Sequence, residues 1–256
     1  MLSAVLHGKK LGTGFAGTRL KIGETQGAED VLTASVFERI AYLPDDVFIR
    51  FIQNLFNFNN QITANPLSEI TFWASWQNQS GCKVEPDVIL KFGGRTVIIE
   101  AKRYDNFQQQ YAYQLANEIS TAYLEGITKP ILLTVGGMSD YRPQNIEYLK
   151  KQIDSALESS FAYEFYAVSW QQLYLALEFA VAESQLEPLE RLLSDIREAY
   201  AWHGIRHQPR QWLENINRDN CNINFEAIPN SKIEKKSWKN LKPIYLTHET
   251  FPSFLG

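Results

Sequence analysis

Residues 84–102, VEPDVILKFGGRTVIIEAK, are the stretch of sequence that decides the fold of this chain. Two runs rich in Val and Ile flank Gly93-Gly94, and a glycine pair between such runs predicts a β-hairpin with a two-residue turn. The expected pairs across the hairpin are Phe92 with Arg95, Lys91 with Thr96, Ile89 with Ile98, and Asp87 with Glu100. One parity is wholly apolar and should face the core; its members are Val88, Leu90, Val97, Ile99 and Ala101.

The other parity of the hairpin gathers charged side chains on one face. Directly opposed side chains of an antiparallel pair have Cβ atoms roughly 4.5–5.5 Å apart, and like charges there are destabilising unless something neutralises them. A divalent cation neutralises Asp87 and Glu100 well, because Mg²⁺ prefers a few carboxylate oxygens together with waters and substrate phosphate. Lys102 follows Glu100 by two residues and should point to the same face. The pattern favours a metal site with a lysine beside it; ordinary ion pairs on a solvent-exposed hairpin face are the alternative.

The segments around the hairpin predict an α/β fold in which helices flank a mixed central β-sheet. Helical periodicity and apolar runs bounded by Gly and Pro support this prediction. Helices are expected over residues 28–42, 46–58, 107–124, 145–157, 171–182 and 186–202, and further strands over residues 18–22, 69–76, 130–135 and 163–168. One domain is expected over residues 1–205, with a C-terminal extension, residues 206–256, packed on the same domain.

Composition narrows the classes of function. The chain has 256 residues, of which 45% are hydrophobic and 21% charged, as is ordinary for a globular protein. Its net charge of −4 argues against a protein that coats nucleic acid through bulk charge, although a local basic groove or a bound metal would still supply positive charge. The sequence has no apolar run long enough to cross a bilayer and no secretory signal at its start. Its two cysteines form no disulfide framework, so a cytoplasmic setting is expected.

The charged segments of the hairpin resemble a known motif. Pro86-Asp87, followed across the hairpin by Glu100-Ala101-Lys102, is similar to the signature of the PD-(D/E)xK nuclease superfamily. In that family a helix before the hairpin often offers a glutamate, for which Glu29 fits best and Glu38 second. The resemblance covers about residues 29–135.

A helix after the hairpin often contains a glutamine in the same family, and Gln114 fits that position best. Gln110 lies one turn before it on the same face, and Gln109 with Tyr113 resembles a Q-x-x-x-Y variant of the motif. The resemblance implies a restriction-endonuclease-like core, to which the C-terminal helices and the C-terminal extension are additions.

What the resemblance implies chemically is the metal-dependent hydrolysis of phosphodiester bonds. The implied ligands of Mg²⁺, for which Mn²⁺ is a substitute, are Asp87, Glu100, Glu29 and the backbone carbonyl of Ala101. Lys102 would orient or help to deprotonate the attacking water and stabilise the developing negative charge. Gln114 would position the site or the phosphate.

The implied function is a nuclease that acts on DNA, in restriction, phage defence or DNA processing. RNA is an open alternative as substrate, and both a homodimer and a partner subunit are open as assemblies; no membrane association is expected. Basic residues that gather within residues 9–21, 206–210 and 235–242 are expected to be solvated or to follow a phosphate backbone. The alternative function is a catalytically silent, nuclease-like subunit that binds nucleic acid or a partner within a larger complex.

His203 and His207 are four residues apart, as zinc ligands on one helix can be. Gly204 intervenes near the expected helix end, and the sequence offers no evident third ligand. A surface or capping role is therefore expected for this pair.

Overall fold

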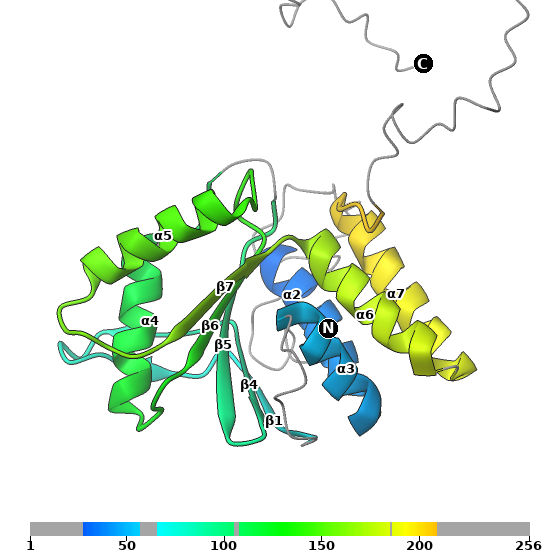
Figure 1. Ribbon diagram of the computed structural model, residues 1–256, viewed down its shortest axis with the longest axis horizontal. Coiled ribbons are helices and arrows are strands. Elements are labelled where there is room, and N and C mark those ends of the chain that lie inside the picture. The colour runs from blue at the N-terminus through cyan, green and yellow to red at the C-terminus, as the bar shows by residue number, and fades with distance from the viewer. Residues whose placement is uncertain (1–27, 57–65, 105–107, 185, 209–256) are drawn as a thin grey trace, which may run out of the picture. The chain divides into compact units, whose positions relative to one another are not determined.

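A five-stranded mixed β-sheet forms the centre of the computed structural model (Figure 1). The structure describes residues 28–56, 66–104, 108–184 and 186–208. The helices are α2 (Ala28–Ile40), α3 (Asp45–Phe56), α4 (Ala112–Leu124), α5 (Pro143–Ala156), α6 (Trp170–Ser184) and α7 (Glu187–His203). The strands are β1 (Leu67–Phe72), β2 (Trp76–Gln77), β3 (Lys83–Val84), β4 (Val88–Phe92), β5 (Arg95–Ala101), β6 (Ile131–Val135) and β7 (Glu164–Val168).

The order of strands in the sheet is β1-β4-β5-β6-β7. The pairs β1·β4 and β4·β5 are antiparallel, whereas β5·β6 and β6·β7 are parallel. Parallel neighbours need a crossover, which α4 and α5 supply in turn (Figure 1). The prediction of a mixed α/β sheet flanked by helices is therefore confirmed.

The central hairpin has the register that its glycine turn predicts. Phe92 pairs with Arg95, and Ile89 pairs with Ile98. Gly93 and Gly94 have φ values of 55° and 72°, in the left-handed region that a tight two-residue hairpin turn requires.

Helices cover both faces of the sheet (Figure 1). The apolar parity of the hairpin packs on α2, α3, α6 and α7 in one core cluster, as its pattern predicts. The other face, with Ile89, Ile98 and Leu132, packs on α4 and α5 in a second cluster that includes Leu115 and Ile153. The charged residues at the end of β5 therefore lie under helices, and not on an open solvent face.

Two predicted elements differ from the structure by more than two residues at one end. The helix expected from residue 107 begins at Ala112, because the backbone amides of Gln109 and Gln110 donate to the carbonyl of Gly137 across the fold. The strand expected over residues 69–76 ends at Phe72, where the next residue has a φ of 47° that breaks the extended backbone.

Other expectations concern residues outside the described ranges. The strand predicted over residues 18–22 lies there, and so does the C-terminal extension from residue 209 onward. The domain boundary at residues 205 and 206 stays a prediction. Among the helices of the described ranges, none has both the length and the apolar character that a membrane span requires.

Candidate active site

The predicted site residues converge at the carboxyl end of β5. Asp87 directly precedes β4, Glu100 is in β5, and Lys102 follows β5 by one residue. The first turn of α2 brings Glu29 to this point, and the first turn of α4 brings Gln114. The carboxyl ends of parallel strands in α/β sheets are where ligands commonly bind, because loops and helix ends leave room there.

Asp87 accepts a hydrogen bond from the backbone amide of Ala101, with Oδ2 2.9 Å from the nitrogen. This bond ties the segment before β4 to the end of β5, so the carboxylate is fixed across the hairpin from Glu100. Burial, together with the charge of Glu100, raises the pKa of Asp87 well above its ordinary value. A neighbouring cation would relieve this cost of ionisation. The carbonyl of Ala101 stays a predicted metal ligand.

Lys102 is the cation of the site. Its Nζ pairs with Oε1 of Glu100 and lies 3.5 Å from Oε1 of Glu29. The other oxygen of Glu29 accepts a hydrogen bond of 2.8 Å from the backbone amide of Arg103. Burial by itself lowers the pKa of Lys102, but the charges of Glu100 and Glu29 outweigh burial and hold that pKa above its ordinary value.

Of the two candidate glutamates on α2, the structure brings Glu29 to the site. Glu38, the second candidate, lines a different hollow, together with Arg191 and Asp195 of α7. Its position explains why α2 contributes through its first turn only.

Gln114 bridges the hairpin and α4. Its Nε2 donates to Oε1 of Glu100 at 2.7 Å and to Oε1 of Glu118 at 3.2 Å. Glu118, one helical turn further along α4, is only 1% exposed. Burial, then the charges of Glu100 and Asp87, raise its pKa well above the ordinary value. Glu118 was not predicted as a site residue, although its spacing from Gln114 places both on one helix face.

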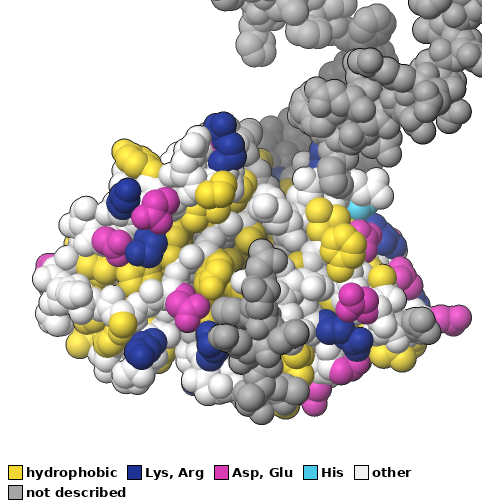
Figure 2. Space-filling view, viewed as in Figure 1, with side chains coloured by type: hydrophobic (Ala, Val, Ile, Leu, Met, Phe, Trp, Pro, Cys, Tyr) yellow, Lys and Arg dark blue, Asp and Glu magenta, His cyan; other side chains and the backbone are white. Residues whose placement is uncertain are grey.

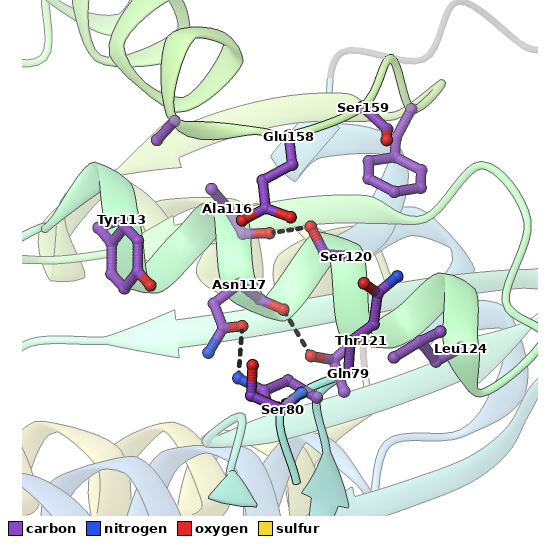
Figure 3. A pocket seen from close by; sticks show the side chains of 13 residues that line it. Gln79, Ser80, Tyr113, Ala116, Asn117, Ser120, Thr121, Leu124, Glu158 and Ser159 are labelled. Carbon is purple, nitrogen blue, oxygen red and sulfur yellow. Dashed lines mark hydrogen bonds between the residues drawn. The ribbon is translucent and has the colours of Figure 1, made fainter. Parts of the chain in front are cut away.

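Tyr113, the tyrosine of the Q-x-x-x-Y variant, lies away from the predicted catalytic residues. Tyr113 is 78% exposed and lines a hollow of about 150 Å³ on the outer side of α4 (Figure 3). Polar side chains line much of that hollow, and the side-chain amide of Asn78 donates to the side-chain oxygen of Asn117 at 3.3 Å. None of the predicted catalytic residues lines this hollow.

A layer of backbone and ring contacts holds the backbone and Cβ of Lys102 in place. The indole Nε1 of Trp170 donates to the carbonyl of Lys102 at 2.7 Å, and the hydroxyl of Tyr200 donates to the carbonyl of Trp170 at 2.8 Å. A Cβ added at Gly136 would lie 2.0 Å from the Lys102 carbonyl oxygen, and one at Gly137 would lie 2.7 Å from the Lys102 Cβ. Only glycine fits at either position.

Gln110 completes this layer. Its Nε2 donates to two backbone carbonyl oxygens, that of Gly136 at 3.1 Å and that of Glu100 at 3.4 Å. Gln110 therefore contacts the backbone under the site, and Gln114 is the glutamine that contacts the carboxylates.

The side chains of the site include donor types that a divalent cation takes. The carboxylates of Asp87, Glu100 and Glu29 are oxygen donors of the kind that Mg²⁺ prefers; the β4·β5 ladder itself ends at Val88 and Ile99, one residue short of the predicted pair. Within the described ranges, no cluster of at least three His, Cys, Asp or Glu side chains has an arrangement that could hold a metal ion. In this structure Lys102 and Gln114 both contact Oε1 of Glu100. A cation that binds Oε1 of Glu100 would have to displace Lys102 from it.

His203 is buried, so of the two expected roles the surface role is wrong for this residue, whereas the capping role stays a prediction. Its side chain is 3% exposed, and burial together with the charge of Arg103 lowers its pKa to about 4. Gly204, with a φ of 72°, ends α7 in the left-handed conformation that commonly closes a helix. The ring of His207 lies 5.3 Å from that of Tyr174.

The charged side chains on the face drawn in Figure 2 are of mixed sign. Lys and Arg are interspersed with Asp and Glu over the coloured part of this face, which shows no broad basic patch among the residues that the structure describes (Figure 2). Two of the three basic clusters noted in the sequence lie outside the described ranges.

A comparison with known proteins finds a relative that is itself uncharacterized. No model of a known family matches the chain. The crystal structure of AF1548, a protein of unknown function, is 14% identical and matches 63% of this chain and all of that one, with a TM-score of 0.27. A likeness at that level establishes neither a shared fold nor a shared activity. PM0110, an uncharacterized protein of Pasteurella multocida (strain Pm70), is 49% identical over an alignment of 261 positions that spans 100% of both chains. The chain therefore belongs to the same family as this Pasteurella multocida protein.

Proposed function

We propose that this protein is a divalent-metal-dependent nuclease of the PD-(D/E)xK type, with a restriction-endonuclease-like core. The observation that supports the proposal is the convergence of five residues from separate parts of the chain at the carboxyl end of β5. They are Glu29, Asp87, Glu100, Lys102 and Gln114. Burying a lysine together with several carboxylates is energetically unfavourable, because each buried charge loses its hydration. Ionisable side chains whose pKa values are shifted by burial and by neighbouring charges are common at functional sites.

Asp87 and Glu100 would hold the Mg²⁺ or Mn²⁺ ion, with Glu29 and the carbonyl of Ala101 as further donors. When bound, such an ion polarises a phosphate and lowers the pKa of a coordinated water. The hydrogen bond from the Ala101 amide fixes Asp87, and Gln114 fixes Glu100, so both carboxylates are oriented before any ligand arrives.

Lys102 would stabilise the negative charge that develops on the phosphate. Its raised pKa means that the side chain is an ammonium, which suits charge stabilisation better than proton abstraction. If a cation shared Glu100, the ammonium of Lys102 would be free to turn toward a substrate oxygen. Glu29 keeps it near the site through the second ion pair.

DNA is the substrate class that the resemblance implies, and it is proposed on that ground. A nuclease that holds its phosphate through a metal and one lysine needs no broad basic surface. The mixed charge on the face in Figure 2 is compatible with that arrangement.

A cleavage panel tests the proposal. Linear, circular, single-stranded and duplex DNA, together with RNA, are incubated with Mg²⁺, Mn²⁺ or EDTA. The wild type is compared with Asp87→Asn and Lys102→Ala, and with Lys91→Ala as the matched control, because Lys91 is on the same hairpin but pairs with Glu69 at the surface.

Cleavage by the wild type and by Lys91→Ala, and loss of cleavage in both site variants, would support the nuclease. If no substrate is cut with either metal, the catalytically silent binding subunit replaces it. If both site variants cut like the wild type, the active site has been assigned to the wrong residues.

A further inference from the structure

The hollow on the outer side of α4 is separate from the candidate active site (Figure 3). Tyr113, Asn117 and Ser120 line it from α4. The turn between β2 and β3 contributes Ser80, and the connection between α5 and β7 contributes Glu158. Its volume of about 150 Å³ is below the roughly 300 Å³ at which pockets for drug-sized ligands begin. The hollow therefore suits a group the size of a single ring system.

Hydrogen bonds within the protein fix the β2–β3 turn against α4. Oδ1 of Asn78 accepts from the backbone amides of Ser80 at 3.0 Å and of Cys82 at 2.9 Å. The side-chain amide of Asn78 in turn donates to Oδ1 of Asn117. Because the oxygen of Asn117 is used in this way, its amide nitrogen has no hydrogen-bond partner among the described residues. The hollow thus has a fixed wall and a donor that is not spent within the protein.

The opposite side of the hollow offers acceptors. The hydroxyl of Ser120 donates to the carbonyl of Ala116 at 2.9 Å, so its oxygen is left to accept. The carboxylate of Glu158, which has no ion-pair partner among the described residues, extends toward α4 (Figure 3). Glu158 is the charged residue of the lining, and among the described residues no Lys or Arg lines the hollow. A phosphate would be repelled there, whereas a neutral group that carries an amino group would be held.

Tyr113 places an aromatic surface at one end of the hollow. Its side chain is 78% exposed and stacks on no other ring of the described residues. Exposed aromatic rings of this kind are surfaces on which unpaired bases stack. The next residue, Gln114, donates to Glu100 of the candidate active site. The hollow and the site therefore lie on neighbouring flanks of the same helical turn.

We infer that the hollow binds one unpaired nucleobase that carries an exocyclic amino group, on the strand whose phosphate the candidate active site holds. Tyr113 stacks on the base, Asn117 donates to an acceptor on its edge, and Glu158 accepts from its amino group. Carboxylates accept in the same way from the N4 amino group of cytosine, whereas thymine presents a carbonyl oxygen at the matching position. This inference rests on the proposed function, because the nuclease brings the strand to α4.

The inference also names the class of substrate. A base inside a duplex is stacked on both faces and paired along its edge, so it has to leave the stack to enter such a hollow. Single-stranded DNA, or a duplex with an unpaired end, offers the base without that cost. The preferred substrate is therefore single-stranded.

The test is the binding of labelled single-stranded oligodeoxycytidine and oligothymidine, each of about 12 nucleotides, to the full chain. Fluorescence anisotropy measures the dissociation constants with Ca²⁺ in place of Mg²⁺. The wild type is expected to bind oligodeoxycytidine at least about fivefold more tightly than oligothymidine, the lower end of the usual discrimination between bases. Glu158→Gln should bring this ratio close to one, because an amide can donate to the carbonyl of thymine.

Tyr113→Ala is expected to weaken the binding of oligodeoxycytidine about 5–150-fold, the range for the loss of one stacked base. Tyr113→Phe keeps the ring and should bind like the wild type. The matched control is Tyr148→Ala, because Tyr148 is 64% exposed on α5 and does not line the hollow. Free cytidine, which lacks the phosphate contacts, should compete at least about a hundredfold more weakly than the oligonucleotide.

The inference is overturned if the wild type binds both oligonucleotides equally or binds neither. Binding by Tyr113→Ala that matches the wild type would also overturn it. Competition by cytidine as strong as that by the oligonucleotide would assign the hollow to free nucleosides instead. In each of these cases, Mg²⁺-dependent cleavage that is lost in Asp87→Asn would show that the proposed nuclease stands without the hollow. The expected discrimination between bases without cleavage would refute the nuclease and keep the base-binding hollow.

Discussion

Replacing Glu118 by Gln should stabilise the metal-free protein at alkaline pH. Burial and the neighbouring carboxylates raise the pKa of Glu118 in the folded state above the ordinary value of 4.5. The folded state therefore binds this proton more tightly than the unfolded state does. As pH rises above 4.5, the wild type loses stability until the pH passes the folded-state pKa, whereas below 4.5 the group makes no difference.

The magnitude follows from linkage. Over that interval, each pH unit costs the wild type about 1.4 kcal/mol from this one carboxyl, and Glu118→Gln avoids that cost. A domain of this size shifts its Tm by about 2–4 °C for each kcal/mol. One pH unit of penalty thus corresponds to a Tm about 3–6 °C higher in the variant.

Thermal unfolding in EDTA at pH 5 and at pH 8 measures this difference. Glu118→Gln should unfold near the wild-type temperature at pH 5 and clearly above it at pH 8, while Glu125→Gln, a change at an exposed residue at the end of α4, should follow the wild type at both. A variant that is less stable than the wild type at pH 8 would refute the reasoning, because Glu118 would then be a favourable ionised group.

The remaining predictions concern the lysine and the layer behind it. Lys102→Met should lower the rate of Mg²⁺-dependent cleavage about 10²–10³-fold, the usual effect of removing one group that stabilises transition-state charge, while Lys91→Met should not change it. Gly137→Ala should lower both Tm and cleavage, because its Cβ would meet Lys102; Gly126→Ala, at a similar φ but with open space around it, should lose only the strain of about 1–2 kcal/mol and keep its activity. Trp170→Phe leaves the Lys102 carbonyl without its donor and should cost about 1–3 kcal/mol in urea unfolding; an unchanged midpoint would contradict the role of that bond.

The hairpin could be predicted from sequence because its determinants are local. Gly93-Gly94 sets the turn, and alternation of apolar and polar residues sets which face each strand buries, so the register followed. Once the register was known, Asp87, Glu100 and Lys102 had to share one end of one face. That end is where the structure brings them together.

Other features depend on contacts between distant segments, which local patterns do not encode. Glu118 is an ordinary residue of a helix until the packing of α4 on the sheet brings it beside Glu100. α4 begins at Ala112 and not at the predicted residue 107. Backbone amides of the residues before Ala112 donate instead to the carbonyl of Gly137, which is distant in sequence. His203 has a helix position that fits solvent or core equally well, and packing placed it inside.

The central claim is that the carboxylate pair of the hairpin holds a divalent cation, and a Mg²⁺ titration of Tm tests it without knowledge of the substrate. At 100 times the dissociation constant, binding stabilises the folded state by about 2.7 kcal/mol, which corresponds to roughly 5–11 °C in Tm. The account predicts a saturable rise of this order in the wild type and its loss in Asp87→Asn, which keeps an oxygen for the Ala101 amide. An equal rise in both proteins, or no rise in the wild type, would contradict it.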